Sequence, residues 1–396
     1  MVLEEVASKV QAAAVAINQD QSSLIRLANA QLSPRIALRL LRCFSAQLPF
    51  LFTAPNEAFL QVEGLSLRHL EKLRDPSNVP TREQLRWCEA PGSRIITAED
   101  SEYPAGLNDL VDPPAMLFIN GNLEERDRFA VAIVGSRHAT PYGKAVAEQF
   151  ATGLSRAGLT VVSGGARGID TAVHRSTVHS GGRAVAILGC GPDVAYPPEN
   201  ASLFQEIASQ GAVISEYPPG AQPDAWHFPA RNRIISGLSQ VTVVVEASDS
   251  SGALITARTA IEQGRAVLAV PGNIDRPASE GCNALIREGI SPALGGEDIL
   301  QAMGAGNLSA APSQGVFNLD IDSGTDSVII TPKDVTPVQE ALLRQLDLSP
   351  RHVDSIASSC SIPIATVSVE LTMLEMKGLA KRLPGNHFVR AGLDRR

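Results

Sequence analysis

Short apolar runs alternate with segments of helical periodicity from Pro91 to about residue 300, and glycine-rich turns join them. Most of these runs do not alternate between polar and apolar residues, which is typical of strands that are buried on both faces. Strands of this kind that alternate with helices form a parallel sheet with right-handed crossovers. The sequence therefore predicts a Rossmann-like, doubly wound parallel sheet of the α/β class.

The apolar runs and the helical segments between them can be placed individually. The expected strands are Ala130–Val134, Thr160–Ser163, Ala184–Leu188, Val213–Ser215, Val241–Glu246 and Ala266–Val270. The expected helices are Gly143–Ala157, Ile169–His179, Ala201–Gln210 and Ala253–Gln263. In an open parallel sheet, ligands bind outside the carboxyl ends of the strands, so the turns after the strands form the candidate site.

Two smaller regions flank this domain, which is expected at residues 86–301. Residues 1–85 show helical spacing and a glycine turn at Val62–Ser66, which predicts a small all-helical domain of the SAM or helix-hairpin-helix type. A turn that only packs two helices is the alternative. Residues 302–336 are rich in Gly, Ser, Asp and Pro, as linkers are. In residues 337–396, three helices followed by a hairpin predict a winged-helix domain.

The first candidate turn is Gly135-Ser136-Arg137, directly after an expected strand. It lacks the G-x-G-x-x-G motif, and no acidic residue follows the second strand to bind a ribose, which disfavours a dinucleotide cofactor. Ser136 and Arg137 at a helix N-terminus suit a phosphate instead. Taken alone, the turn is explained equally well by a surface arginine without a binding role.

The second candidate turn follows the strand Thr160–Ser163. Its glycines let the backbone curl around an anion, with Arg167 at the tip, and Asp170 is expected to cap the helix or to orient Arg167. A strand, a glycine-rich turn with one arginine and a helix, in this order, indicate an anion site. The glycines are Gly164, Gly165 and Gly168.

Arg231, Asn232 and Arg233 lie at the start of an apolar helical segment, shortly after Trp226. Arginines near an aromatic side chain suit a groove for a nucleic-acid backbone with occasional base stacking. The alternative is that these arginines pair with acids such as Glu216 or Glu246. Two further turns after strands add weaker donors, namely Ser251-Gly252 and Asn273.

Several catalytic patterns are missing from the sequence. There is no G-x-S-x-G elbow, no GKS or GKT phosphate loop and no H-E-x-x-H motif, and the histidines lack ligand spacing. We therefore expect no catalytic residues, no metal and no cofactor.

The formal net charge of −8 argues against a nucleic-acid partner, because Lys and Arg supply most of the non-specific affinity for phosphates. The charge is uneven, however. From Arg128 to Arg183 there are seven basic and two acidic residues, a local excess of +5. From charge alone, a solvated basic face explains this excess more readily than a functional patch.

The compartment is indicated by the cysteines and by hydropathy. The five cysteines form no C-x-x-C pair, so neither a disulfide framework nor a zinc site is indicated. No run of 18 apolar residues occurs, and the N-terminus MVLEEVASKV carries acids, which disfavours a membrane span and a signal peptide. We expect a cytoplasmic protein without a membrane partner.

Five motifs, in order, resemble the DNA-processing protein A family, also called DprA or Smf: VAIVGSRHATPYGKAVAE, SGGARGIDTAVHRSTV, AILGCGPDVAYPPEN, FPARNRIISGLS and VPGNIDRPASEGCNALIREG. The resemblance covers most of Arg94–Leu294. It implies an extended Rossmann domain that binds single-stranded DNA in a basic pocket, forms a homodimer, and loads the RecA recombinase onto DNA protected by single-strand-binding protein. It also implies a part in natural transformation, or competence, and in homologous recombination, without turnover.

The positions that match the family's phosphate-contacting pattern are Gly135, Ser136, Arg137, Gly164, Gly165, Arg167, Gly168, Arg231, Asn232 and Arg233. Ser251, Gly252 and Asn273 complete the expected DNA-binding set. Because their turns follow successive parallel strands, Arg137 and Arg167 are expected at one edge of the sheet, where Arg231 and Arg233 would continue a track for the DNA backbone. Ala253 departs from the family, which commonly has a serine there.

Two other functions stay open. Rossmann-like enzymes that cleave nucleotide N-glycosidic bonds need a glutamate after their glycine turn, and none follows Gly252 until Glu262. A winged-helix regulator with a small ligand in the Rossmann domain would instead bind one duplex sequence tightly.

Overall fold

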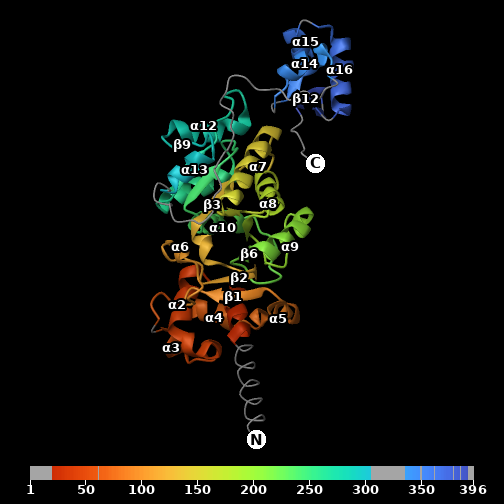
Figure 1. Ribbon diagram of the computed structural model, residues 1–396. Coiled ribbons are helices and arrows are strands. Elements are labelled where there is room, and N and C mark those ends of the chain that lie inside the picture. Colours follow the sequence, from red (N-terminus) through yellow and green to blue (C-terminus); the bar gives the residue numbers. More distant parts are fainter. Residues whose placement is uncertain are drawn as a thin grey trace. The chain divides into compact units, whose positions relative to one another are not determined.

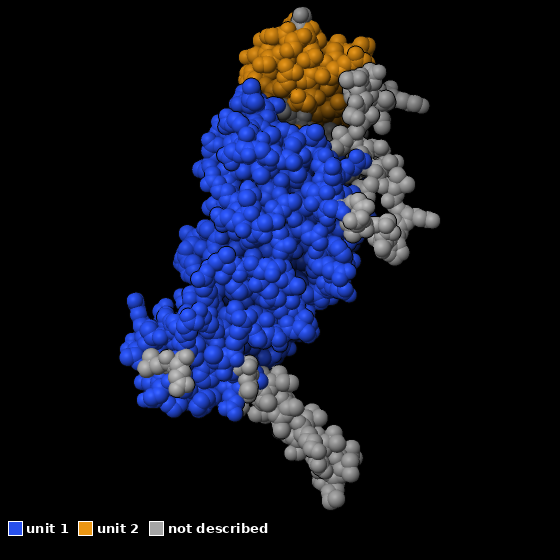
Figure 2. Space-filling view, turned by 90° about the vertical axis from the view of Figure 1, so that its left-hand side faces the viewer, with its two compact units in different colours: residues 1–138, 147–317 blue, residues 139–146, 318–396 orange. Residues whose placement is uncertain are grey.

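The computed structural model of the chain describes residues 20–60, 62–304, 335–347, 350–360, 362–377, 379–383 and 385–390. Figure 2 shows the two compact units into which the chain divides, residues 1–138 with 147–317 and residues 139–146 with 318–396. The expected linker at 302–336 lies almost wholly outside the described residues.

The larger unit is built on nine strands (Figure 1): β1 (Ser93–Thr97), β2 (Met116–Gly121), β3 (Ala130–Val134), β4 (Thr160–Ser163), β5 (Arg183–Leu188), β6 (Ala212–Ser215), β7 (Val241–Val244), β8 (Ala266–Ala269) and β9 (Ser291–Pro292). Their order in the sheet is β1-β2-β6-β5-β4-β3-β7-β8-β9. All neighbours from β6 to β9 are parallel, which confirms the predicted parallel sheet, although the two-residue strand β9 was not itself predicted. The strand order reverses between β3 and β7, since β4, β5 and β6 follow on one side of β3, and β7 and β8 on the other.

The helices after β3 are also close to their predicted bounds, and α8 and α9 match them fully. The helical elements are α7 (Pro141–Arg156), α8 (Ile169–His179), η4 (Pro198–Asn200), α9 (Ala201–Gln210), α10 (His227–Gly237), α11 (Gly252–Glu262), η5 (Pro277–Ser279), α12 (Glu280–Arg287) and α13 (Gly296–Ala302).

Both faces of the parallel sheet are buried, which explains the continuous apolar runs. In β5, Ala184, Ala186 and Leu188 pack in a core with side chains of α8 and α9. Val185 and Ile187 pack in another core, with side chains of α10 and α11. Because successive side chains of a strand point to opposite faces, a strand that is covered on both sides has few polar positions.

Short helices fill the N-terminal region: helical residues 20–29, α2 (Pro34–Phe44), η1 (Ser45–Phe52), α3 (Asn56–Leu60), α4 (Leu67–Arg74), η2 (Pro76–Asn78), α5 (Arg82–Glu89) and α6 (Ala105–Asn108). Side chains from most of them share one core with Met116 and Phe118 of β2, and Figure 1 shows α2, α4 and α5 beside β1 and β2. The antiparallel pair β1–β2 extends the sheet beyond β6 and was not predicted. In β1 only Ile96 is buried, so its apolar signal is weak.

An arginine side chain of the protein itself occupies the glycine turn of the N-terminal region. Gly64, between α3 and α4, has a φ of +83°, and a Cβ there would lie 2.6 Å from Arg39 Nη1. The same nitrogen donates to Glu63 O at 2.6 Å. A cation of the protein therefore occupies the turn, which favours the packing alternative over a phosphate-binding one.

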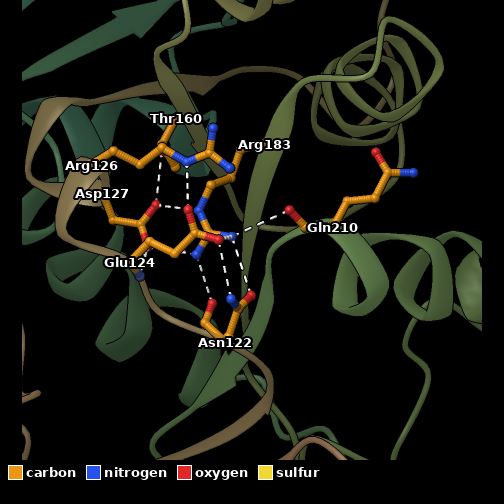
Figure 3. A network of polar contacts seen from close by, with 7 residues as sticks. All are labelled: Asn122, Glu124, Arg126, Asp127, Thr160, Arg183 and Gln210. Atoms are coloured by element: carbon orange, nitrogen blue, oxygen red, sulfur yellow. Dashed lines mark hydrogen bonds and ion pairs between the residues drawn. The ribbon is translucent and has the colours of Figure 1, made fainter.

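A buried arginine ties the opposite, amino-terminal ends of the strands together (Figure 3). Arg183, the first residue of β5, has only 2% of its side chain exposed and donates to both carboxylate oxygens of Asp127, in η3 (Glu125–Phe129), at 2.6 and 2.7 Å. Asp127 also accepts from Thr160 at the start of β4. Arg183 and Arg128 are thus paired with nearby acids, which reduces the local basic excess seen in the sequence.

The smaller unit contains the predicted winged helix. It consists of α14 (Pro337–Gln345), β10 (Arg351–His352), α15 (Val353–Cys360), α16 (Ile364–Met376), β11 (Ala380–Leu383) and β12 (His387–Arg390). The three helices and the hairpin are confirmed, and β10 adds a third strand, in the order β10-β12-β11. In the described parts of the chain, no single helix has the length and apolarity to span a membrane; only the bent pair of α15 and α16 meets these criteria jointly.

Candidate nucleic-acid interface

A pocket of about 660 Å³ opens at the carboxyl ends of the parallel strands. Its wall comes from the turns after β3, β4 and β7 and from the first turns of α10 and α11. The strand order reverses here, which is where open α/β sheets bind their ligands. We call it the switch-point pocket. Seven candidate residues line it: Gly135, Ser136, Arg137, Arg231, Asn232, Ser251 and Gly252.

The other six candidates do not line this pocket: Gly164, Gly165, Arg167, Gly168, Arg233 and Asn273. Arg233 lines a second cavity, which the N-terminal helices help to form. Asn273 is exposed in the turn after β8, where its carbonyl oxygen accepts from the N–H of Arg276. The four arginines that the sequence places on one track are therefore not gathered in one pocket.

The glycines of the first two turns allow these turns to pack against each other. The N–H of Ile169 donates to Ser136 O at 3.1 Å. Gly168 has a φ of +82°, and a Cβ at this position would lie 2.2 Å from Ser136 O. A Cβ on Gly135 would lie 2.5 Å from Ile169 Cγ1. Protein atoms are thus the close neighbours of these glycines, and the contact fixes the wall that carries Arg137.

Arg137 is the exposed cation of the switch-point pocket. Its guanidinium carbon lies 5.1 Å from the ring centroid of Phe228, at the start of α10. Stacking on a ring orients a guanidinium without using its N–H donors, which remain for a planar or tetrahedral oxyanion. Within the described residues, no ion pair involves Arg137.

Arg231 lies beneath the pocket and is only 4% exposed. Its guanidinium donates to Gly164 O at 2.5 Å, to Ile187 O, and to Asn232 Oδ1 at 3.2 Å. Burial lowers the pKa of Arg231 to about 10, and the charge of Asp170 acts against that shift. Arg231 therefore joins the turn after β4 to the end of β5 and remains charged at neutral pH.

Asp170 is buried beside Arg231. Burial raises the pKa of this carboxyl above its usual value, although Arg231 and the N–H of Ala166 oppose the rise. The structure contradicts the expectation that Asp170 orients Arg167. The side chain instead balances the buried guanidinium and accepts from Ala166 at 3.2 Å.

Arg167 pairs with an acid from a distant part of the chain. Its Nε and Nη2 donate to the two carboxylate oxygens of Glu199, in η4, at 2.5 and 3.1 Å. Both side chains are more than half exposed. The neighbouring Asn200 is buried and donates to Gly165 O and to Thr171 Oγ1, so the segment that carries Glu199 is fixed to the glycine turn.

Arg233 pairs with an acid, as the alternative explanation of its motif predicts. Its Nη2 lies 2.6 Å from Glu216 Oε1, and both side chains are 16% exposed. This mostly buried ion pair occupies the guanidinium, so Arg233 does not add a free charge to the switch-point pocket.

The N-terminus of α11 supplies further donors. Ser251 is the N-cap, and its hydroxyl accepts from the N–H of Ala253 at 3.3 Å. Ser250 and Gly252 line the pocket next to it. The amides and the dipole at a helix N-terminus favour an anion. Ala253, which carries no hydroxyl, also lines the pocket.

Some pocket residues were outside the expected set, namely Asp170, Tyr196, Phe228, Ser250 and Thr256. Phe228 and Ser250 lie within motifs that the sequence singles out, so attention to their neighbours would have found them. Tyr196, in the loop after β5, also lies within one of the five family-like motifs, whereas Thr256, inside α11, lies outside them. Across the described residues, no three His, Cys, Asp or Glu side chains are placed to hold a metal ion.

Comparisons with known proteins identify the family to which the chain is similar. Residues 94–304 match the family model of DNA recombination-mediator protein A, and residues 331–386 match that of the DprA winged helix domain. The chain is 34% identical to protein Smf of Synechocystis sp. over 83% of this chain and 88% of that protein. It is 36% identical to protein Smf of Escherichia coli over 83% and 86%.

The fold is also found in a solved structure. The X-ray structure of DNA processing protein A from Streptococcus pneumoniae superposes with a TM-score of 0.59 and 34% identity. The superposition covers 71% of this chain and 97% of that one. The family model spans more than half of the chain, and the relatives are matched over most of their length. The chain therefore belongs to the DNA recombination-mediator protein A family.

Proposed function

We propose that this chain binds single-stranded DNA without sequence preference, through phosphate contacts in the switch-point pocket. The observation that carries the proposal is the exposed guanidinium of Arg137 beside the N-terminus of α11, at the point where the strand order reverses. A phosphate bound there accepts from the guanidinium, from serine hydroxyls and from backbone amides. Such contacts read no base, so the affinity depends on the backbone and falls with salt.

The finer part of the proposal comes from the family resemblance. We propose that the chain acts as a homodimer in the cytoplasm and loads the RecA recombinase onto DNA covered by single-strand-binding protein, without turnover, in transformation and recombination. Residues 86–301 would form the DNA-binding domain, between the helical domain 1–85 and the winged helix 337–396. The test is strand exchange by RecA on DNA coated with single-strand-binding protein, with and without the chain. Unchanged exchange would refute this part alone.

Arg137→Ala tests the binding site. We expect the affinity for a labelled oligo-dT, measured by fluorescence anisotropy, to fall about tenfold or more, because a charge-assisted bond to phosphate and its counterion release are lost. Arg258→Ala removes an exposed arginine of α11 that does not line the pocket, and should bind as the unchanged protein does. Equal affinities for all three proteins at moderate salt would refute the proposed site.

A competition assay and a product assay separate the alternatives. A winged-helix regulator would prefer one duplex sequence to any single strand, so competition with random duplex and single-stranded DNA distinguishes it. An N-glycosidic hydrolase would release free base from nucleoside monophosphates. Its required glutamate is not in the pocket: Glu262 is the last residue of α11 and exposed, about 15 Å along the helix from Gly252.

Glu199→Gln should strengthen the binding of single-stranded DNA. The Glu199 carboxylate occupies the two donors of Arg167 that a phosphate would use, and it adds a negative charge next to the turn. Exposed pairs are weak, so we expect a gain of about two- to fivefold in affinity, measured by anisotropy.

Two further variants isolate this competition. Glu206→Gln removes the charge of an exposed acid on α9 and should change the affinity less. In an Arg167→Ala background, Glu199→Gln should have no more effect than Glu206→Gln, because no guanidinium is left to release. A gain that persists without Arg167 would show that only long-range charge is involved.

A further inference from the structure

A second cavity, of about 700 Å³, lies between the N-terminal helices and the start of α10. We call it the aromatic pocket, because Tyr217, Trp226 and His227 line one side of it. Leu27, Ala28 and Leu32 of the N-terminal helical region also line it. Polar side chains such as Asn29, Asn78 and Gln84 line it as well. Its size and its mixture of aromatic, aliphatic and polar groups suit a small flat molecule or group.

The three aromatic residues form a rigid cluster. The rings of Tyr217 and His227 stack with centroids 3.7 Å apart. Trp226 lies edge-to-face against them, at 4.2 Å from His227 and 6.1 Å from Tyr217. His227 is further held by Gly189 O, 3.1 Å from its Nδ1. A tryptophan fixed in this way loses little side-chain entropy when another ring stacks on it.

Trp226 is nevertheless 56% exposed, whereas Trp87, the other tryptophan of the chain, is 8% exposed in the N-terminal core. Burial raises the pKa of the Tyr217 phenol, and burial lowers the pKa of His227, so both supporting rings are uncharged at neutral pH. The cluster therefore offers an exposed, neutral π-surface on a rigid support.

The aromatic pocket and the switch-point pocket share a wall. Ala225, Phe228 and Pro229 line the switch-point pocket, while Trp226, His227 and Ala230 line the aromatic pocket. Neighbouring Cα atoms are 3.8 Å apart, so the wall between the two pockets is the N-terminal turn of α10. The two pockets are therefore neighbours, as the phosphates and the bases of one DNA strand are.

Charge excludes phosphates from the aromatic pocket. Four acids line it, Glu83, Asp112, Asp193 and Glu216, against one cation, Arg233. Glu216 pairs with Arg233, and Asp112 pairs with Arg35, which does not line the pocket. Glu83 and Asp193 carry the remaining negative charge. An anion is repelled by this lining, whereas a neutral base is not, and carboxylates accept hydrogen bonds from the amino groups that bases carry. The two pockets thus match the two parts of a nucleotide, one cationic for the phosphate and one apolar and acidic for the base.

We propose that the aromatic pocket takes up a nucleobase of the bound single strand, stacked on Trp226, while the adjacent phosphates stay in the switch-point pocket. This inference rests on the proposed binding of single-stranded DNA. Stacking on an aromatic ring accepts every base, so it adds affinity without adding sequence specificity. It also favours single strands, because paired bases in a duplex cannot leave the stack without cost.

The test compares an oligo-dT with an oligomer of the same length whose sugars carry no bases. For Trp226→Ala, we expect an affinity for oligo-dT about tenfold below that of the unchanged protein, and for Trp226→Phe a smaller loss. On the abasic strand, the variants and the unchanged protein should bind equally. Phe50→Ala removes another exposed aromatic side chain, outside both pockets, and should have no effect on either strand.

Fluorescence provides a second measurement. In Trp87→Phe, Trp226 is the only tryptophan, and its emission should be quenched by oligo-dT and not by the abasic strand. The inference is overturned if Trp226→Ala binds oligo-dT as tightly as the unchanged protein, or if it loses the same factor on both strands. Arg137→Ala must still weaken both strands; if it weakens neither, the proposed function itself fails.

Discussion

Arg231→Met is expected to lower the free energy of unfolding by about 3–5 kcal/mol, as measured by urea denaturation. The side chain is 4% exposed, and its donors satisfy the carbonyl oxygens of Gly164 and Ile187. Methionine fills a similar volume, yet it leaves two buried acceptors unpaired and the buried charge of Asp170 uncompensated. The turn after β4 loses its connection to β5, so the affinity for single-stranded DNA should fall as well.

Three controls separate the loss of hydrogen bonds from the loss of charge compensation. Arg175→Met removes an exposed arginine of α8 and should change the free energy of unfolding by less than about 0.5 kcal/mol. In an Asp170→Asn background, Arg231→Met should lower the free energy of unfolding by less, because no buried charge is left.

The third control is the pH. Burial already raises the pKa of Asp170, and the loss of Arg231 raises it further. The folded state then binds a proton more tightly than the unfolded state, so the damage should shrink as the pH falls. Equal stability of Arg231→Met and Arg175→Met would contradict this account.

The parallel strands were predictable because their burial is symmetric. β3 begins and ends with its apolar run, and β4 matches its predicted bounds, since every residue of both strands is buried. β1 and β2 were missed for the opposite reason. β1 has a single buried residue, and β2 packs Met116 and Phe118 into the core of the N-terminal helices. The sequence predicts these helices but not that a strand packs against them.

The location of the candidate site was predictable from the topology, but the roles of its arginines were not. Turns after parallel strands meet at one edge, so Arg137 and Arg231 reach the same pocket. Whether an arginine is free, paired or buried depends on residues far away in the chain. Glu199 is 32 positions from Arg167, and Glu216 is 17 positions from Arg233. No spacing rule in the sequence relates such pairs, and only the packed structure shows that Arg137 keeps an exposed charge.

Gly168→Ala is expected to have the other large effect, a loss of about 3–5 kcal/mol in the free energy of unfolding. Gly168 has a φ of +82° and a ψ of −123°, a backbone conformation that residues with a Cβ rarely adopt. The new Cβ would lie 2.2 Å from Ser136 O and 2.7 Å from the carbonyl carbon of Arg137. These are backbone atoms of the pocket wall, so the collision can be relieved only by moving the segment that carries Arg137.

Gly181→Ala is the matched control for this prediction. Gly181 also has a positive φ, +71°, but a Cβ there would meet no atom within 4 Å. Its cost should therefore be the backbone strain alone, about 1–2 kcal/mol, and single-stranded DNA should bind as to the unchanged protein. Denaturation and anisotropy on both variants then separate strain from collision. Because the collision displaces Arg137, Gly168→Ala must lose affinity even at temperatures where it is fully folded. If both variants lose equal stability and keep equal affinity, the packing of the two turns does not position the phosphate site.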